Sequence, residues 1–517
     1  MIFGSRIDSI FRMVIMAIST AISTYREFYR KIKTFQDISS VLQWDSEVMM
    51  PKNGRENRST QIAEITQLIH DWSVSSEYKS KIRNAKLELS SFSSNEKKLW
   101  EREFSILEEE MEKAEKIPSE FVAEFSQTTN LAHGVWAEAK KNQKFSEFLP
   151  ILEKIVNLSK RQADYVGYAT EPYDVHLDAY EKGAKASDIE ILFKDLKKEL
   201  VPIVESAPYF ESPFKKLISK EKQEKLCKRL PPLLGLSYDD SRLDTSHHPF
   251  STSLGKKDKR ITTRYSEMDP LSSIFGVLHE TGHSLYESGL SMMTEWPSPL
   301  TEFCSLGIHE SQSRLWENQV GRSRSFWEFL YPILLSDFEL SSEELPFNDL
   351  YKSINSTQKS KIRVEADQIT YNLHIILRFE IERDLINGKI KVSELPEIWN
   401  AKVKDYLGLT IENDSEGVLQ DVHWSMGGFG YFPTYTLGNI FSAQLFSSFE
   451  KDHSNYKSEF KNNGNFSALL NWLRDEVHSK GKTLEAKQLI LSATLEEPSS
   501  KYLISYLKKK VLQIQST

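Results

Sequence analysis

Apolar residues recur at helical spacing in the first third of the chain. Between residues 96 and 116, Leu99, Phe104 and Leu107 stand among acidic and basic residues, which is the pattern of an amphipathic helix. The charged residues of that segment are expected to form a solvated face and not a binding patch. Long helices with exposed charge are therefore expected from residue 20 to about residue 165.

A different pattern appears between Thr245 and Tyr265. Residues 260–265 are β-branched or aromatic apart from two arginines, so a strand or two is expected there. After Asp269 the helical pattern returns and continues to the C-terminus, without an internal repeat, a low-complexity segment or a long flexible linker. We predict a mostly α protein, one large helical unit with a small β-sheet near the candidate metal site described below.

Composition supports the helical prediction and narrows the function. Only 21 glycines and 18 prolines occur in 517 residues, which is low for a protein rich in turns and strands. A formal net charge of −8 argues against a dedicated nucleic-acid binder, which would present a basic face. The two cysteines, Cys227 and Cys304, lie far apart in the sequence. This excludes a disulfide framework and favours the reducing cytoplasm.

The N-terminus contains an apolar run over residues 10–22. Arg12 interrupts this run, and the run is too short to span a bilayer, so no membrane association is expected. We expect residues 1–20 to be an extension that is disordered or that precedes the natural start at Met13 or Met16. The first turn of a helix and a targeting segment are the alternative interpretations.

One motif has the spacing of a metal site, His279-Glu-Thr-Gly-His283. Residues four apart on an α-helix share a face, so both imidazoles can reach one ion and Glu280 can reach a water bound to it. Asp269 suits the N-cap of such a helix, Pro270 its first position and Gly289 its C-terminal stop. The alternative is a pair of histidines that share a helix face without binding metal.

A catalytic zinc ion needs a third protein ligand and one open position. A second helix is expected from Pro299 to a stop at Gly321, and it offers Glu302, His309 and Glu310 as the third ligand. Spacing alone does not choose among these three. The residues directly after the motif contain no third histidine at the metzincin spacing, so that subclass is excluded.

Six separate signatures resemble the carboxypeptidase Taq family of metallocarboxypeptidases, in that family's order. The matching segments are residues 42–45 with 50–51, His248-Pro-Phe250, residues 258–262, the motif at 279–283 with residues 308–318, residues 362–367 and residues 417–424. The likeness runs from about residue 25 to the C-terminus. It departs from the family in the first twenty-odd residues and in the loop of residues 286–301, which is expected to be one residue longer.

The resemblance implies zinc ligands His279, His283 and Glu310, with Glu280 as general base. One Zn²⁺ per chain is expected, with Co²⁺ or Mn²⁺ as substitutes. Members of the family are typically homodimers that release single residues from peptide C-termini with broad specificity, proline being disfavoured. Peptides are thus the expected substrates, and a homodimer is the expected assembly.

The resemblance also implies a fold. We expect a mostly helical structure like those of angiotensin-converting enzyme and neurolysin, with a deep groove that N-terminal helices partly roof. Residues 21–517 would form a single metallocarboxypeptidase domain, with its catalytic core at about residues 240–450.

Peptide hydrolysis passes through a tetrahedral oxyanion that needs positioned hydrogen-bond donors. His423 and Tyr431 are the candidates, with Tyr435 in reserve. The glycine-rich run of residues 427–433 would let the backbone approach the substrate closely. The alternative is that the tyrosines are core aromatics with satisfied hydroxyls.

A carboxypeptidase must also recognise a free C-terminal carboxylate, which the planar fork of arginine binds bidentately. Arg363 is the first candidate and Arg260 the second, because both lie in family signatures associated with the closed end of the groove. A structural ion pair, with Asp367 or Asp258, is the alternative. His248 is expected to line the groove or orient the substrate, with plain packing as its alternative.

Supporting roles are expected for Trp424, Gln420 and Asp421, and Asp421 is a candidate to orient a histidine. Two rival functions are weighed against the carboxypeptidase. An endo-acting oligopeptidase on the same kind of scaffold would accept C-terminally amidated peptides, whereas a carboxypeptidase would cleave them poorly. A catalytically dead helical scaffold would need a broken motif, and this motif is intact.

Overall fold

The computed structural model describes residues 20–290, 292 and 297–516. Of the predicted extension over residues 1–20, all but the last residue lies outside the described residues. Residues 291 and 293–296, part of the loop expected to be longer, also lie outside them.

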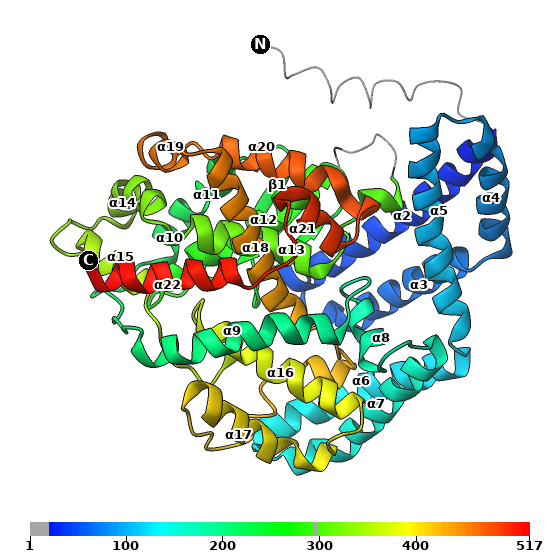
Figure 1. Cartoon of the computed structure of the whole chain (residues 1–517), viewed down its shortest axis with the longest axis horizontal. Helices are drawn as coiled ribbons and strands as arrows, with labels where there is room; N and C mark the ends of the chain where they lie inside the picture. Colours follow the sequence, from blue (N-terminus) through cyan, green and yellow to red (C-terminus); the bar gives the residue numbers. More distant parts are fainter. Residues whose placement is uncertain (1–19, 291, 293–296, 517) are drawn as a thin grey trace.

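Long helices build the N-terminal third, as predicted (Figure 1). They are α2 (Thr20–Val48), α3 (Arg55–Ser73), α4 (Ser76–Leu87), α5 (Ser94–Lys116), α6 (Ser119–Asn142) and α7 (Phe145–Val166). In α5, Trp100, Phe104 and Leu107 are buried at the i, i+4, i+7 spacing of one helix face. Leu99, predicted to belong to that face, is 44% exposed, because it lies one residue off the buried stripe.

The described residues form two separate apolar clusters. The smaller cluster belongs to α2, α4 and α5 and includes Tyr25, Tyr78 and Phe104; Figure 1 shows these helices at one end of the molecule. Buried Glu103 of α5 connects these helices to the rest of the protein. Its carboxylate accepts hydrogen bonds from Tyr25 of α2 (2.8 Å) and from Ser298, outside the cluster (2.7 Å). The larger cluster forms the core of the remaining helices.

The predicted small sheet precedes the motif helix. Four helices lead to the sheet, α8 (Tyr173–Asp178), α9 (Ala186–Ser206), α10 (Lys220–Cys227) and α11 (Leu230–Leu234). The strands β1 (Ser241–Thr245), β2 (Ser251–Ser253) and β3 (Lys259–Thr263) come next, and the motif helix α12 (Pro270–Leu290) follows them. The spatial order is β1-β3-β2, with β1 parallel and β2 antiparallel to β3. The hydroxyls of Ser251 and Ser284 lie 3.0 Å apart, so β2 is tied to α12.

Helices continue to the C-terminus. They are α13 (Leu306–Arg314), a π-helical turn (Leu315–Val320), α14 (Arg324–Phe338), α15 (Phe347–Ile354), α16 (Thr370–Ile386), α17 (Leu395–Leu407), α18 (Pro433–Asp452), α19 (Tyr456–Asn463), α20 (Ser467–Glu476), α21 (Ala486–Thr494) and α22 (Lys501–Ser516). In α16 every residue from 370 to 379 is buried. Polar side chains on this central helix must therefore find partners inside the protein.

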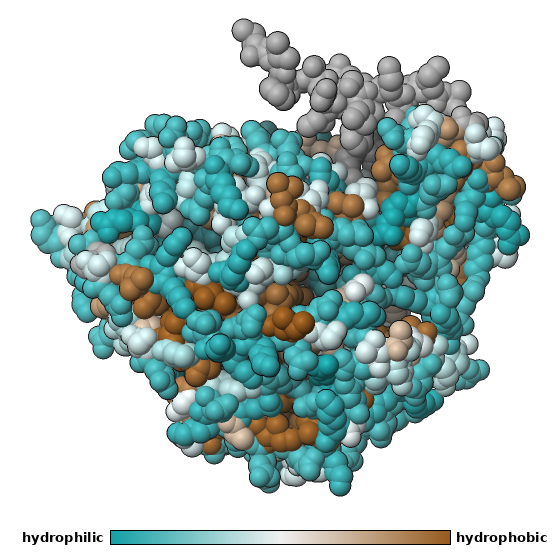
Figure 2. Space-filling view, in the orientation of Figure 1, coloured by the Kyte–Doolittle hydropathy of each residue, from teal (hydrophilic) through white to brown (hydrophobic). Residues whose placement is uncertain are grey.

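The surface agrees with a helical protein whose apolar residues are mainly internal. The face in Figure 2 is mostly hydrophilic, with hydrophobic residues in small separate patches. Within the described residues no helix is both long enough and apolar enough to cross a bilayer. The predicted mostly α fold with one small sheet is confirmed.

Candidate active site

Helix α12 carries the motif and begins where the sequence predicted. The Asp269 side chain accepts a hydrogen bond from the backbone N–H of Ser272 (3.3 Å), and Pro270 is the first helical residue. Gly289 does not end the helix, which continues to Leu290. A Cβ on Gly289 would lie 2.3 Å from Nδ1 of His478, so close packing and not a helix stop requires the glycine.

Helix α13 brings the third candidate ligand. Ser305 caps its N-terminus by accepting from the N–H of Ile308 (3.0 Å). Buried Glu181 lies at the same helix end and accepts from the N–H of Gly307 (2.9 Å). The predicted helix start at Pro299 is only a short 3-10 turn, and α13 proper begins at Leu306.

Glycines let the backbones of three helices meet at this point. A Cβ on Gly282 of α12 would lie 2.6 Å from the carbonyl oxygen of Gln312 in α13. A Cβ on Gly438 of α18 would lie 2.6 Å from Cγ of Glu310. Real Cβ atoms essentially never come within 3.0 Å of such atoms, so the position of Glu310 depends on both glycines.

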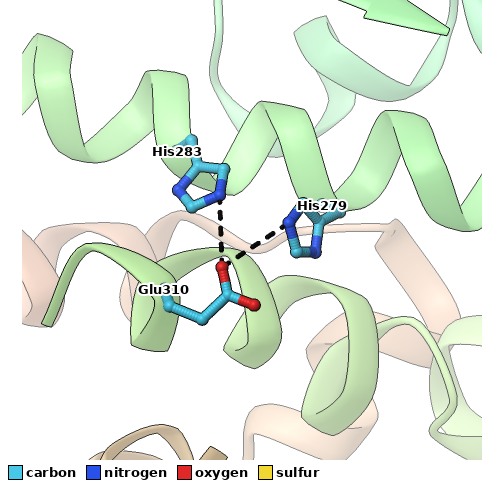
Figure 3. Close-up of side chains that lie close together, drawn as sticks. All are labelled: His279, His283 and Glu310. Carbon is cyan, nitrogen blue, oxygen red and sulfur yellow. Dashed lines mark ion pairs between the residues drawn. The ribbon is translucent and has the colours of Figure 1, made fainter. Parts of the chain in front are cut away.

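His279, His283 and Glu310 converge on one point (Figure 3). Oε2 of Glu310 lies 3.7 Å from Nε2 of His279 and 3.5 Å from Nε2 of His283. Ligands of a tetrahedral zinc ion with bonds of about 2.0–2.1 Å are roughly 3.4 Å apart. The three donors therefore fit a divalent cation of this size.

The other ring nitrogens of both histidines are also engaged. Nδ1 of His279 lies 2.9 Å from Glu317 Oε2, and Nδ1 of His283 lies 3.1 Å from the carbonyl oxygen of His309. Both partners accept hydrogen bonds, so they engage Nδ1 of each ring and leave Nε2 facing the shared point as the atom that can bind a metal. Carboxylate and carbonyl partners of this kind are usual behind metal-binding histidines.

Arg314 connects two of these acidic groups. Its Nε donates to Oε1 of Glu310 (2.7 Å), and its Nη1 donates to Oε2 of Glu317 (3.1 Å). Oε1 of Glu310 is thus held by the guanidinium, while Oε2 faces the histidines and also lies 3.1 Å from the Ser313 hydroxyl. Sequence reasoning gave no role to Arg314 or Glu317, although their spacing of four and seven residues after Glu310 places them on its helix face.

The two other candidates for the third ligand have different partners. Glu302 accepts from Tyr29 (3.3 Å) and from Lys482 (2.8 Å). Nε2 of His309 lies 3.0 Å from Oε1 of Glu287. The structure thus brings Glu310, and neither of these residues, to the histidine pair.

Glu280 lies beside the first histidine and is 7% exposed. Burial raises the pKa of its carboxyl to about 7, although the neighbouring His279 acts in the opposite direction. A carboxyl with a pKa near neutrality is well suited to exchange protons with a substrate or water.

The metal-site geometry agrees with the comparison to known proteins. The family model described as Carboxypeptidase Taq (M32) metallopeptidase matches residues 24–511. The chain belongs to this family. It is therefore a peptide-hydrolysing enzyme of the metallocarboxypeptidase type.

Relatives in the carboxypeptidase Taq family align along almost their whole length. Thermostable carboxypeptidase 1 of Pyrococcus furiosus is 38% identical over 494 residues, covering 94% of this chain and 97% of the relative. Carboxypeptidase 1 of Bacillus subtilis is 36% identical over 500 residues, covering 96% and 99%.

Solved structures of the family share the fold. The M32 carboxypeptidase from Deinococcus radiodurans R1 has a TM-score of 0.92 at 33% identity, covering 96% of this chain and 100% of that chain. The structure of the Pyrococcus furiosus carboxypeptidase has a TM-score of 0.89 at 36% identity, covering 96% of this chain and 99% of that chain.

The aromatic candidates of this carboxypeptidase pack against one another, and the Tyr435 ring lies 5.2 Å from the Arg363 guanidinium. The ring of Tyr431 packs against those of His423 (5.3 Å) and Tyr435 (5.4 Å). Burial raises the pKa of both tyrosines, and Glu310 and Arg363 are among the charged groups that act on them. Burial lowers the pKa of His423 to about 4, so its imidazole is neutral at pH 7.

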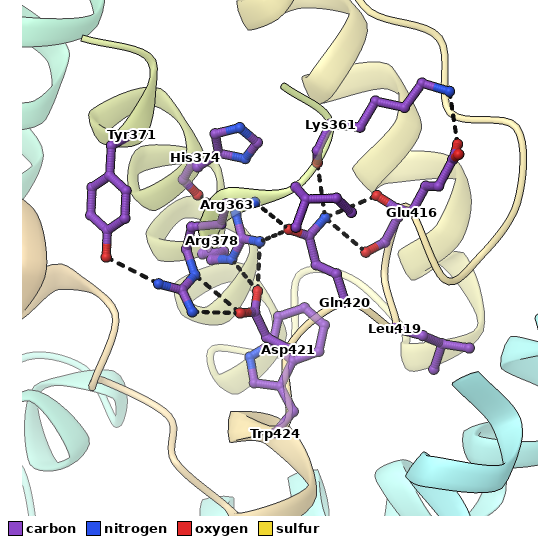
Figure 4. A network of polar contacts seen from close by, with 12 residues as sticks. Lys361, Arg363, Tyr371, His374, Arg378, Glu416, Leu419, Gln420, Asp421 and Trp424 are labelled. Carbon is purple, nitrogen blue, oxygen red and sulfur yellow. Dashed lines mark hydrogen bonds and ion pairs between the residues drawn. The ribbon is translucent and has the colours of Figure 1, made fainter. Parts of the chain in front are cut away.

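Arg363 is 6% exposed and belongs to a polar network (Figure 4). Its Nε and Nη2 donate to Oδ1 of Asp421 (3.0 and 2.8 Å), and its Nη1 donates to the Tyr371 hydroxyl (3.0 Å). The guanidinium of Arg314 lies 4.6 Å from the centre of the Tyr371 ring. Through Tyr371 and Arg314, Arg363 is thus connected to the ligand Glu310.

The ion pair considered for Arg363 exists, but its partner is Asp421 and not Asp367. Asp367 instead caps α16 by accepting from the N–H of Ile369 (2.7 Å). The expectation that Asp421 orients a histidine is wrong, because its carboxylate oxygens bind Arg363 and Arg378. Nδ1 of His423 is buried without a hydrogen-bond partner among the described residues.

Arg260 and His248 lie at the sheet, apart from this network. Arg260 pairs with Asp258 (Nη2 to Oδ2, 2.8 Å), as its structural alternative proposed, and lies 4.6 Å from the centre of the Trp44 ring. His248 is exposed, with its ring 4.6 Å from that of His247. Within the described part of the chain, neither side chain contacts the metal ligands.

Proposed function

We propose that the protein is a zinc-dependent carboxypeptidase that releases single residues from peptide C-termini with broad specificity, proline being disfavoured. The observation that carries this proposal is the convergence of His279, His283 and Glu310 beside buried Glu280, in a chain of the carboxypeptidase Taq family.

His279, His283 and Glu310 would hold the zinc ion through Nε2, Nε2 and Oε2. When bound, the ion supplies a Lewis acid that polarises the scissile carbonyl and lowers the pKa of water. Arg314 and Glu317 keep the ligands in this orientation from behind. Co²⁺ and Mn²⁺ are proposed as substitutes, because imidazole and carboxylate donors also suit them.

Glu280 acts as the general base. It takes a proton from the attacking water and passes it to the leaving amine, so the same carboxyl serves both halves of the reaction. Its pKa of about 7 in the buried site supports this role, and the charge of a bound cation would act against this rise and favour the ionised base.

His423 and Tyr431 donate hydrogen bonds to the oxygen of the tetrahedral intermediate. Three observations support these roles: the neutral His423 ring, its contact with Tyr431, and the influence of the Glu310 charge on Tyr431. Tyr435 stays in reserve, because its ring faces Arg363 at 5.2 Å.

Arg363 is proposed to bind the C-terminal carboxylate of the substrate. Its bonds to Asp421 and Tyr371 use three of its five N–H donors, and they fix the plane of the guanidinium. Arg260 is the second candidate and His248 is proposed to line the groove. Arg363 ranks first because Tyr371 and Arg314 connect it to the metal ligands.

Several broader attributes belong to the same proposal. They are a homodimer, a cytoplasmic location, a single domain over residues 21–517 with its core at 240–450, and a groove like that of angiotensin-converting enzyme and neurolysin. Free, buried Cys227 and Cys304 support a reducing compartment. Light scattering of the purified protein tests the dimer, and elemental analysis tests one zinc per chain.

Mass spectrometry of a peptide mixture incubated with the zinc-loaded protein tests the reaction and its direction. We expect ladders that shorten one residue at a time from the C-terminus and stop before proline. Peptides with an amidated C-terminus should be cleaved poorly, because they lack the carboxylate that Arg363 is proposed to bind. Internal cleavage of amidated peptides would favour an endopeptidase, and loss of residues from the N-terminus would contradict the proposal.

A further inference from the structure

Glu382 is a carboxyl buried in the middle of α16, with an exposed fraction of 0%. Oε1 accepts from the indole N–H of Trp424 (2.8 Å). Oε2 accepts from the Tyr173 hydroxyl (2.8 Å) and from the backbone N–H of Gly430 (2.9 Å). Three donors, one from α8 and two from the loop before α18, thus meet on one side chain that has no place in the reaction described above.

Two of these donors are the immediate sequence neighbours of the proposed oxyanion donors. Trp424 follows His423 directly, and Gly430 directly precedes Tyr431. We infer that Glu382 is a positioning residue for catalysis, which fixes both ends of the 423–431 segment and thereby places His423 and Tyr431 against the substrate carbonyl. This inference rests on the roles proposed for His423 and Tyr431.

The segment itself needs such an anchor, because its backbone is glycine-rich. Gly427 and Gly430 have φ values of 70° and 84°, which side-chain-bearing residues rarely adopt. A Cβ on Gly430 would lie 2.5 Å from the backbone carbonyl carbon of His176. Glycine offers no side chain to hold the loop, so the Gly430 N–H is fixed from outside by Glu382.

Helix α16 holds the preceding residues in the same way. Arg378, one turn before Glu382, donates to Oδ2 of Asp421 (2.8 Å) and to Oε1 of Gln420 (2.7 Å). Figure 4 shows this cluster with Trp424 beside Asp421. The buried helix therefore fixes the stretch from Gln420 to Gly430 at successive points, and Glu382 makes the contacts nearest the two proposed donors.

Glutamine is a sharp probe of this arrangement. Its amide has one accepting oxygen and one donating nitrogen. The indole N–H of Trp424 and the peptide N–H of Gly430 can only donate, so Glu382→Gln must lose one of these bonds in either orientation. The Tyr173 hydroxyl can rotate to accept. We expect the amide oxygen to face the two donors at the Oε2 position and the bond to Trp424 to break.

The experiment measures kcat, KM, zinc content and the affinity for a phosphonate peptide analogue. The tetrahedral phosphonate group mimics the intermediate, and its charged oxygen mimics the oxyanion. We expect Glu382→Gln to lower kcat and weaken the analogue by about tenfold each, since misplaced donors cost transition-state binding. KM should stay within twofold, and the zinc content should be unchanged. Trp424→Phe removes the same hydrogen bond from the other side and should give the same loss.

Double variants show whether Glu382 acts through the proposed donors. In a His423→Ala/Tyr431→Phe background, Glu382→Gln should cause no further loss of kcat. Combining Glu382→Gln with Trp424→Phe should cost no more than either change alone. A full tenfold loss in the background that lacks both donors would overturn the inference, as would a kcat for Glu382→Gln within twofold of the natural protein.

Two controls separate positioning from folding stability. Tyr173→Phe leaves the same buried carboxyl with one donor fewer but does not touch the loop, so we expect a lower melting temperature and kcat within twofold. Glu380 lies on the same helix but binds Lys197 (2.7 Å) and Lys402 (2.5 Å), away from the loop. The variant Glu380→Gln should therefore have the kcat of the natural protein. A loss of kcat in either control equal to that of Glu382→Gln would mean that the effect is only structural.

The proposed roles of the donors fail on a different result. If His423→Ala and Tyr431→Phe each keep the kcat of the natural protein, the oxyanion assignment is wrong whatever Glu382→Gln does. If those two variants lose activity while Glu382→Gln does not, the assignment stands and the positioning role of Glu382 is rejected.

Discussion

The metal centre and the Arg363 network are two buried polar clusters with opposite character. At the metal centre, Oε2 of Glu310 faces Nε2 of His279 at 3.7 Å and Nε2 of His283 at 3.5 Å. In the network, the Asp421 carboxylate is saturated by two guanidinium groups. The first cluster has bonding capacity left for a cation, whereas the second has used most of its own to hold the fold together.

This difference predicts different responses to substitution. Removing a group from an open cluster should change chemistry with little effect on stability. Removing a group from a closed cluster should first destabilise the protein, because a buried charge loses its partner.

The largest effect is expected at the open cluster. Glu280→Gln keeps the size of the side chain but removes the base, so kcat/KM should fall by about 10⁴-fold. Zinc content and melting temperature should match those of the natural protein. Steady-state kinetics, elemental analysis and thermal unfolding check this, and a variant that keeps more than a tenth of the activity would remove Glu280 from the mechanism.

The closed cluster should respond in stability. Asp421→Asn leaves Arg363 and Arg378 without their carboxylate, which should cost about 3–5 kcal/mol in the free energy of unfolding. Denaturant titration measures this loss. Asp258→Asn is the matched control, because Asp258 pairs with the more exposed Arg260 and should cost about 1 kcal/mol or less. Equal losses in both variants would contradict the distinction between the clusters.

Glu181 tests the support behind the metal-site helix through pH. Burial raises the pKa of its carboxyl to about 7 from an ordinary value of 4.5, so the folded protein favours the protonated form. Its contribution to stability is present below pH 4.5 and is lost as the pH rises through 7. Relative to Glu181→Gln, the natural protein should lose on the order of 3 kcal/mol across this window. If the free energies of unfolding of the two proteins change with pH in the same way, the pKa of Glu181 is not raised.

The smallest effect is expected at Arg314. Arg314→Met removes the group that holds Oε1 of Glu310, which should weaken zinc binding by about 10- to 100-fold while the three ligands remain. Competition with a coloured chelator measures the zinc Kd. Arg324→Met, which removes an exposed ion pair with Glu328, is the control and should leave the Kd unchanged. An unchanged zinc Kd in Arg314→Met would show that the three ligands keep their positions without Arg314.

The features that the sequence could predict are those that depend on local geometry. His279 and His283 are one helical turn apart, so their convergence follows from local geometry. The helix start at Asp269, the small sheet and the mostly α fold were likewise readable from local patterns. The choice of Glu310 over Glu302 and His309 came from a family resemblance, because spacing alone could not show which side chain faces α12.

Long-range pairings were beyond such reasoning. The Arg363–Asp421 bond joins residues 58 apart, whereas the alternative considered from the nearby sequence was a pair with Asp367, which instead caps α16. The sequence also does not show the close approach of helices at Gly282 and Gly438. A glycine inside a helix normally indicates only a less stable helix. Glu382 resembled any other charge on a helix until the fold brought Tyr173, Trp424 and Gly430 to it.

The glycines that frame the metal centre have a consequence for ion choice. Gly282 packs against the backbone of Gln312 and Ser313, which cannot yield as a flexible side chain would, and Gly438 packs directly against Glu310. The cage therefore has little room to expand. Calcium requires six to eight oxygen ligands at about 2.3–2.6 Å, which a rigid cage of two imidazoles and one carboxylate oxygen cannot supply. Discrimination against this abundant ion is therefore a result of helix packing as much as of ligand chemistry.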